Sequence, residues 1–308
     1  MGEVHQLLMK HGLTEVRRSM SGDDKHGRLC VEAAHAVMSD ERSQIGIAHA
    51  GFAMAALPHR RIDETVWERD GGPIKLLVES GLDSSRNPVG VPYGAIARMI
   101  LLYLQTQAVK TQSRDVELGN SMNAWLTAMN ISVGGKTYQM VREQARRISR
   151  CRLTFFNRTA DHEYVSNGAF VRDAIFPLEH ITAGQGRLWQ EVVRLDESFY
   201  QSLIDHPLPL RDVAIAQISN RSMAIDIYIW LAYRLHALDR PIDVTWAALK
   251  SQFGSGYKEL RFFRRDMMPS LKLALSVYPE ARVIVDETKG LTLHPSAAPI
   301  PERRIAAR

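Results

Sequence analysis

The chain has 308 residues, 45% of them apolar, so it can bury a substantial core, and its length predicts about two domains. Its net charge is +5 and its pI is near 9.2, which mildly favours a polyanionic partner. Only two cysteines are present, Cys30 and Cys151, which excludes a disulfide framework or a thiolate metal site and indicates a reducing compartment. No secretion signal is expected at the start, and the most apolar stretch, 223–235, is too short to span a bilayer. We therefore expect a cytoplasmic protein without a membrane segment.

The first part of the chain predicts helices followed by strands. Helical pieces at 4–10 and 29–38 flank a polar run, and we interpret residues 1–43 as an appended N-terminal helical arm. Strand signals at 44–50 then open the first domain. Two further strands, at 66–69 and 74–78, flank Asp70-Gly71-Gly72, where glycine supplies the positive φ of a tight hairpin.

A helix, a break and a basic helix follow. Pro92 and Gly94 introduce a helix with apolar residues at spacings of three and four, and a short strand is expected at 116–118. Asn120 or Ser121 is a plausible N-cap of the next helix. After the break at Gly134-Gly135, residues 136–150 predict a basic helix that leads into a strand at 152–156.

The same order of elements recurs in the second half. Gly184 and Gly186 mark a domain boundary, after which a strand is expected at 188–195 and a short helix at 196–204. A buried helix at 223–236 precedes Asp243, the expected N-cap of a helix at 244–253. After Gly254-Ser255-Gly256 comes a second basic helix, at 257–272.

A β-hairpin closes the second copy. Val283 and Val285 alternate so that they face Leu291 and Leu293 across the turn 286–290. A short helix, a glycine break, a basic helix and a hairpin are the sequence pattern of a winged helix-turn-helix, whose basic helix enters the DNA major groove. We therefore predict an α+β protein with tandem winged helix-turn-helix domains and an N-terminal helical arm.

We assign the chain four segments. These are the arm at 1–43, a first winged-helix domain at 44–183 for DNA-backbone contact or dimerisation, a second at 184–296 for sequence recognition, and a flexible basic tail at 297–308.

The first basic helix has an apolar side and a basic side. Arg142, Arg146 and Arg150 follow one another at intervals of four and have no acidic neighbour except Glu143. A solvated charged face is one explanation, but an unpaired row of like charges costs stability unless it meets an anion, which favours phosphate contact. The candidate DNA-binding residues of this domain are Lys136, Gln139, Arg142, Arg146, Arg147 and Arg150.

In the second basic helix the cations form a narrow stripe opposite an apolar side made of Leu260, Met267, Leu271 and Ala274. Glu259 and Asp266 are expected to lie away from this stripe, which predicts a cationic ridge without salt bridges. Pro269 is expected to kink or end the helix, which weakens the case for Lys272. The candidate residues of this domain are Lys258, Arg261, Arg264, Arg265, Lys272 and Lys289.

Three segments resemble the plasmid-encoded RepA replication initiators: Gly135–Ile148, Phe262–Asp266 and Tyr278–Ala281. The resemblance covers roughly residues 44–293. It implies tandem winged-helix domains that bind repeated sites (iterons) in double-stranded plasmid origin DNA, local strand opening, and recruitment of the host initiator and replicative helicase. It also implies that the first domain often carries a dimer interface and that the monomer is active on DNA, so the hairpin at 155–170 is expected either to touch DNA or to pair across protomers.

Other functions have weaker support in the residues. Gly134-Gly135-Lys136-Thr137 resembles the end of a phosphate-binding loop, but the glycine needed earlier is Asn130 and no strand precedes it. The histidines form no H-x-H or HExxH pattern, so a metal-dependent nickase is not expected. We expect no enzymatic activity, no cofactor and no metal. A transcriptional repressor built on the same modules, which represses its own gene, remains the alternative, because both functions use the same basic helices.

Overall fold

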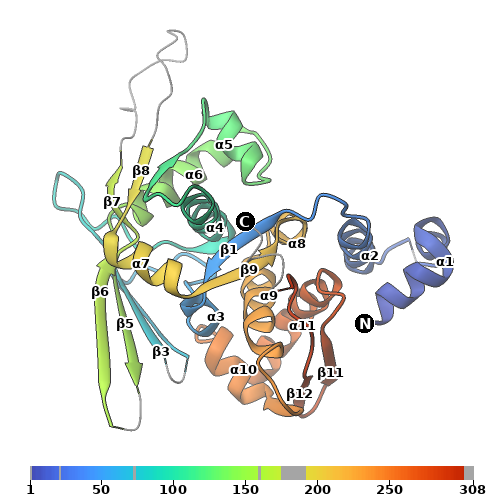
Figure 1. Cartoon of the computed structure of the whole chain (residues 1–308). Helices are drawn as coiled ribbons and strands as arrows, with labels where there is room; N and C mark the ends of the chain where they lie inside the picture. The colour runs from blue at the N-terminus through green and yellow to red at the C-terminus, as the bar shows by residue number, and fades with distance from the viewer. Residues whose placement is uncertain (1, 21, 72–73, 159–160, 175–191, 302–308) are drawn as a thin grey trace. The chain divides into compact units, whose positions relative to one another are not determined.

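The computed structural model describes residues 2–20, 22–71, 74–158, 161–174 and 192–301, and Figure 1 labels most of its elements. The chain divides into two compact units. The terminal unit combines both ends of the chain, Met1–Ala56 and Leu208–Arg308, and the central unit is Leu57–Pro207. Helices and strands occur in both units, so the expected α+β class is confirmed.

The terminal unit is built around a buried helix, α9. Its elements are α1 (Glu3–Ser19), α2 (Lys25–Met38), β1 (Ile45–His49), α3 (Gly51–Met54), β9 (Pro207–Arg211), α8 (Asp212–Ile218), α9 (Ser222–Leu235), β10 (Ile242–Thr245), α10 (Trp246–Phe253), α11 (Leu260–Ser276), β11 (Arg282–Asp286) and β12 (Gly290–His294). Eleven of the 14 residues of α9 are buried, because α3, α8 and α11 all pack against it. The Trp230 ring of α9 meets the Phe253 ring of α10 edge to face. The expected buried helix is confirmed.

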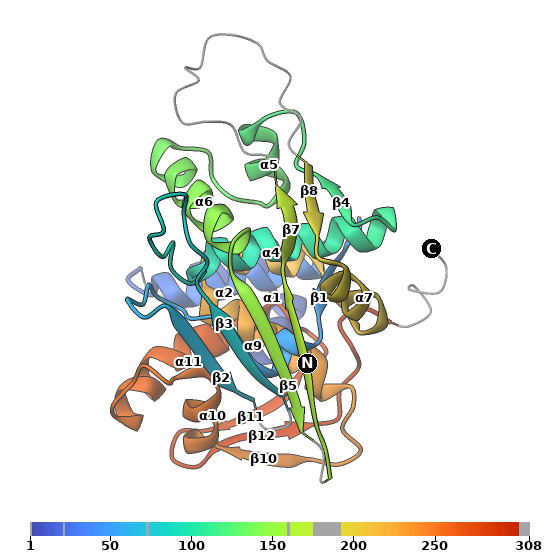
Figure 2. The ribbon, with the colours of Figure 1, turned by 90° about the vertical axis from the view of Figure 1, so that its left-hand side faces the viewer.

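Strands β10, β12 and β11 form an antiparallel sheet with β12 in the middle (Figure 2). The expected hairpin register is confirmed, since Val283 pairs with Leu293 and Val285 pairs with Leu291. Gly290 starts β12 with φ +142°, and a Cβ at this position would lie 2.1 Å from the carbonyl oxygen of the neighbouring strand. Glycine is therefore needed where the hairpin meets β10.

Two expectations about the helices of this unit are wrong. Asp243 does not cap α10, because it lies in β10 and accepts a hydrogen bond from Thr292 across the sheet at 2.6 Å. The cap is Thr245, whose Oγ1 accepts from the Ala248 N–H at 3.2 Å. Helix α11 also does not end at Pro269 but continues to Ser276, since its residues beyond the proline pack into the core formed with α9 and α2.

The N-terminal helices pack within the terminal unit instead of forming an appended arm. Helix α2 packs against α8 and α11, and α1 packs against α2. His5 of α1 is fully buried, and its Nε2 donates to the Ser276 carbonyl at the end of α11 at 2.8 Å. Gly12, with φ +73°, interrupts α1 with a kink.

The central unit places its helices beside two small sheets. Its elements are β2 (Val66–Asp70), β3 (Ile74–Glu79), α4 (Gly94–Thr111), β4 (Asp115–Glu117), α5 (Met122–Ala128), α6 (Gly135–Ile148), β5 (Arg152–Arg158), β6 (Glu163–Ala169), β7 (Val171–Ala174), β8 (Val192–Leu195) and α7 (Glu197–Asp205). One sheet has the antiparallel order β2-β3-β5-β6 and the other the order β4-β8-β7. Helix α4 packs against α6 and α7. The expected hairpins β2–β3 and β5–β6 are therefore present.

The two halves repeat their elements but not their strand pairing. Strand β4 precedes α5 as β10 precedes α10, but β4 pairs with β8, whereas β10 pairs with the hairpin strand β12. In the central unit the hairpin β5–β6 instead extends the hairpin β2–β3, because β5 lies between β3 and β6. The internal similarity is thus one of element order.

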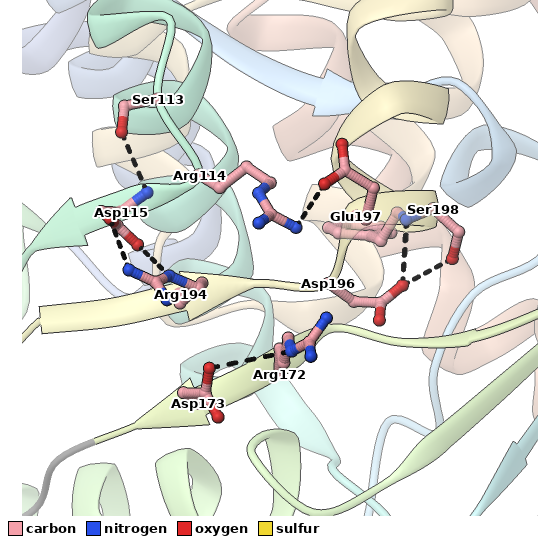
Figure 3. A network of polar contacts seen from close by, with 10 residues as sticks. Ser113, Arg114, Asp115, Arg172, Asp173, Arg194, Asp196, Glu197 and Ser198 are labelled. Atoms are coloured by element: carbon pink, nitrogen blue, oxygen red, sulfur yellow. Dashed lines mark hydrogen bonds and ion pairs between the residues drawn. The ribbon is translucent and has the colours of Figure 1, made fainter.

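A polar network joins β4 and β8 to the start of α7 (Figure 3). Arg194 donates to both carboxylate oxygens of Asp115, at 2.6 and 2.9 Å, and this partner lowers the pKa of Asp115. Arg114 forms an ion pair with Glu197 at 2.6 Å. Asp196 caps α7 by accepting from the backbone N–H of Ser198 at 3.1 Å. These charges are matched to one another, so the network has a structural role.

The boundaries of the two compact units differ from the boundaries of the four expected segments. Strand β1, where the first domain was expected to begin, pairs with β9 in the terminal unit. The expected boundary between 183 and 184 lies outside the described residues, as does residue 302 onward in the expected tail. The terminal unit is discontinuous because its strand pairing and the packing of α2 on α11 join segments far apart in sequence.

Candidate nucleic-acid interface

Helix α11 presents one face to the core and another to solvent. Phe263, Met267 and Leu271 have no exposed surface, and they hold the helix on α9 and α10. Leu260, which we expected on this apolar side, is 41% exposed. The expected side of α11 is otherwise confirmed, with Phe263 in the place of Leu260.

The cations of α11 are exposed but two of them have acidic partners. Arg261 pairs with Glu259 at 2.8 Å and Arg265 pairs with Asp266 at 2.9 Å. The expectation of a ridge without salt bridges is therefore wrong, because both carboxylates are sequence neighbours whose side chains reach the stripe. The two pairs are at the surface, where such pairs contribute about 0–1 kcal/mol, so either guanidinium can exchange its partner for another anion at little cost.

Arg264 connects α11 to the β11–β12 hairpin. It is half-buried, and its Nη1 donates to the Glu287 carbonyl in the hairpin turn. The turn is itself held by Asp286, whose carboxylate accepts from the hydroxyl and backbone N–H of Thr288 and from the Lys289 N–H, and these bonds lower its pKa to about 2. The hairpin is thus fixed relative to the helix, and the side chain of Lys289 is exposed at its turn.

Lys258 and Lys272 lie at opposite ends of the α11 region. Lys258 is exposed just before the helix begins, beside the Gly254–Gly256 break. Lys272 is exposed in the second half of α11, on the part that packs with α2, and its charge acts on the Cys30 thiol. Burial raises the pKa of that thiol to about 11, so it is protonated at neutral pH.

The first basic helix, α6, presents most of its expected cations to solvent. Five of the six candidates are exposed: Lys136, Gln139, Arg142, Arg146 and Arg150. Arg146 pairs with Asp83 at 3.3 Å, and Arg150 Nη1 lies 3.5 Å from the Leu82 carbonyl oxygen. Among the described residues Arg142 has no ion-pair partner, since the neighbouring Glu143 pairs with Arg147.

Arg147 is the exception. The prediction that it lies on the exposed basic face is wrong. It is only 5% exposed. Its Nη1 donates to the Val91 carbonyl at 2.9 Å, its Nη2 and Nε donate to Glu143 at 2.8 and 3.1 Å, and its guanidinium lies 5.0 Å from the Tyr93 ring centroid. The side chain joins α6 to the segment before α4, so its donors are directed into the protein.

Phe262 is an exposed residue that was not among the candidates predicted from the sequence. Phe262 is 39% exposed on α11, and the guanidinium groups of Arg261 and Arg265 lie against its ring. Its neighbour Phe263 is buried, and neither phenylalanine was assigned to a side of the helix from the sequence. Helical phase is the signal that separates them: at 100° per residue, position 262 falls with 261 and 265, away from 263, 267 and 271.

The alternative sites remain without structural support. Residues 134–137 follow helix α5 and lead into helix α6. A phosphate-binding loop follows a strand, so this segment does not have the setting of such a loop. Trp125 and Trp246 are both 2% exposed, so they are core residues. Within the described ranges, no three His, Cys, Asp or Glu side chains gather as a metal site would require. Among those same ranges, none of the helices has the length and hydropathy needed to cross a bilayer.

The sequence model of the plasmid-encoded RepA protein family matches residues 91–247, just over half of the chain. The chain belongs to this family. The RepA resemblance seen in the sequence is thereby confirmed, and the protein is a plasmid replication initiator by family. The match contains α4, α5, α6 and α9.

Two crystal structures of RctB domains are similar to this chain. Domains 2 and 3 of RctB, crystallised as selenomethionine derivatives, have a TM-score of 0.53 and 13% identity to this RepA-family chain, and the alignment covers 82% of this chain and 99% of that one. A second crystal structure of RctB domains 2-3 has a TM-score of 0.49 and 14% identity, with coverages of 80% and 95%. At this identity the first likeness shows a shared fold alone. No curated protein matches in sequence.

Proposed function

We propose that this RepA-family chain initiates replication by binding repeated duplex sites in a plasmid origin through winged-helix modules. The observation that carries the proposal is the order α9, β10, α10, α11, β11, β12, in which the exposed Arg261 and Arg265 lie on the third helix. A winged helix-turn-helix has this order, and its third helix enters the major groove. The antiparallel sheet β10-β12-β11, with the hairpin at its edge, agrees with a wing.

Charge and rigidity support α11 and the hairpin as one binding surface. Lys258, Arg261 and Arg265 offer cations on and beside the helix, and Lys289 offers one on the hairpin turn. The bond from Arg264 to the hairpin fixes these groups relative to one another before DNA arrives, which reduces the ordering cost of binding. The helix would read base edges while the hairpin contacts phosphate.

The central unit repeats the order α4, β4, α5, α6, β5, β6, and we propose it as a second winged-helix module. The exposed side chains of Arg142 and Arg146 on α6, and of Arg150 just after it, support phosphate contact. Strand β6 is an edge of its sheet and exposes Tyr164 (70%) and Val165 (43%), which supports pairing between protomers. The two roles are compatible with a dimer that dissociates, leaving the monomer to bind the origin.

Initiation needs no catalytic residue in this proposal, because binding energy from several bound protomers deforms and opens adjacent DNA. The opened strands would then receive the host initiator and the replicative helicase. An autoregulatory repressor is the alternative, since the same helices would occupy an operator without opening it.

Permanganate footprinting of a supercoiled plasmid that carries the repeats flanking the protein's own gene tests the proposal. We expect unpaired thymines to appear next to the occupied repeats, and expect them to disappear with the double variant Arg261→Ala/Arg265→Ala. Occupied repeats without reactive thymines would support the repressor instead. Equal affinity for repeats and unrelated DNA would refute both functions.

A further inference from the structure

The exposed ring of Phe262 has no packing explanation. It is 39% exposed on a helix whose inward positions are filled by Phe263, Met267 and Leu271, each with no exposed surface. Leaving a large aromatic ring partly in water forgoes part of the stabilisation of full burial, which is about 1.5–3 kcal/mol for a phenylalanine. The ring lies instead among the groups that the proposed function directs at DNA.

Two guanidinium groups are stacked against this ring. The Arg261 Cζ lies 4.6 Å from the ring centroid and the Arg265 Cζ lies 5.4 Å from it, both within the range of a cation–π interaction. Each guanidinium is also paired with a carboxylate, Arg261 with Glu259 and Arg265 with Asp266. The ring and the acids together hold both guanidinium groups in set directions on one face of α11.

We infer that Phe262 determines part of the sequence specificity by contacting the 5-methyl group of a thymine, between guanines read by Arg261 and Arg265. This rests on the proposed function, which places α11 in the major groove. The thymine methyl is the apolar group that a base pair presents there, and it accepts contact from phenylalanine, while arginine pairs with the O6 and N7 atoms of guanine. An aromatic ring between two arginines therefore matches a thymine close to G·C pairs.

The residues around the ring fit DNA as the partner of this face. Phe262 has Arg261 and Arg265 against it, and arginine is the side chain that pairs with guanine in the major groove. Leu260, the first residue of the same helix, is 41% exposed and has no aromatic ring on which a guanidinium could stack. Leu260 therefore serves as a matched control of similar exposure.

The test removes the methyl group from the DNA and the ring from the protein. The full chain first selects its site from a pool of random duplexes, and the selected duplex is then made with thymine or with deoxyuridine throughout. Burying one methyl group is worth about four-fold in affinity, so the parent should bind the uracil duplex about four-fold more weakly. With Phe262→Ala the thymine-to-uracil ratio should fall close to one, and with Leu260→Ala it should stay near four-fold.

The thymine-to-uracil ratio is compared between the parent and each variant. A change in DNA shape caused by uracil alters the ratio equally in all of them, whereas loss of a direct contact alters it only in Phe262→Ala. A parent ratio of one, or a ratio that Phe262→Ala leaves unchanged, would overturn the inference while leaving specific binding intact. Failure of the parent to select any sequence would overturn the proposed function and this inference with it. Circular dichroism of each variant confirms that α11 is folded.

Discussion

The guanidinium of Arg147 lies so close to Gly90 that a Cβ added to the glycine would be 2.1 Å from Arg147 Nη1. Gly90 also has φ +86°, a conformation that side chains rarely adopt. The same guanidinium donates to the next carbonyl along the chain, that of Val91. A residue from a basic helix is thereby used to hold α6 against the segment that precedes α4.

Arg147→Ala should lower the free energy of unfolding by about 1–3 kcal/mol, since it removes the guanidinium donor of the buried Val91 carbonyl and the cation paired with Glu143. Arg142→Ala, on the same helix but exposed and unpaired, should change it by less than about 0.5 kcal/mol. Urea denaturation of the full chain measures both. Equal effects of the two substitutions would show that Arg147 is not a structural residue. Gly90→Ala should destabilise as well, because its Cβ takes the place of the guanidinium.

Arg142→Ala should reduce the salt dependence of DNA binding. Each phosphate contact contributes about 0.9 to the slope of log affinity against log salt, so removing one cation should lower that slope by about 0.9. Arg146→Ala should act similarly, because its surface pair with Asp83 is weak. Fluorescence anisotropy at several salt concentrations measures the slope. If neither slope changes, α6 contacts protein and the central unit is an assembly module.

Arg261→Ala and Arg265→Ala should each weaken binding to the selected site by about 1–3 kcal/mol, the value of a bidentate contact with guanine. Affinity for unrelated duplex DNA should fall much less, since phosphate contacts elsewhere remain. The ratio of the two affinities, measured at one salt concentration, is the readout. Loss of specific and non-specific affinity in equal proportion would assign both arginines to phosphates.

The stability of the terminal unit should fall in mild acid because of His5. Burial lowers the pKa of this imidazole below its ordinary value of 6.5, while the Ser276 carbonyl and Glu280 act in the opposite direction. The unfolded chain therefore binds a proton at His5 more readily than the folded chain does. The contribution of His5 to the free energy of unfolding is fully present above about pH 7.5 and declines as the pH falls through 6.5.

His5→Gln is the matched variant, because its amide can still donate to the Ser276 carbonyl but does not titrate. Its unfolding free energy between pH 5 and 8 should vary less than that of the parent, with the difference confined to the acidic side. Parallel pH profiles for parent and variant would contradict this role of His5.

Local sequence was sufficient for most individual elements. The register of β11 on β12 follows from the alternation of Val283 and Val285, because side chains on a strand alternate between faces. The burial of α9 follows from apolar residues on all its sides. The candidate cations were also located by periodicity alone, and four of the five on and just after α6 are exposed as expected.

Only the tertiary structure decided how those elements combine. Arg146 and Arg147 are adjacent and chemically identical, yet one is exposed and the other is buried against Gly90, a residue far from it in sequence. Strand β4 similarly pairs with β8 instead of the following hairpin, and both chain ends join one unit. Periodicity reports which side of an element is apolar, but the choice of neighbour depends on the free energy of long-range contacts, which no local pattern contains.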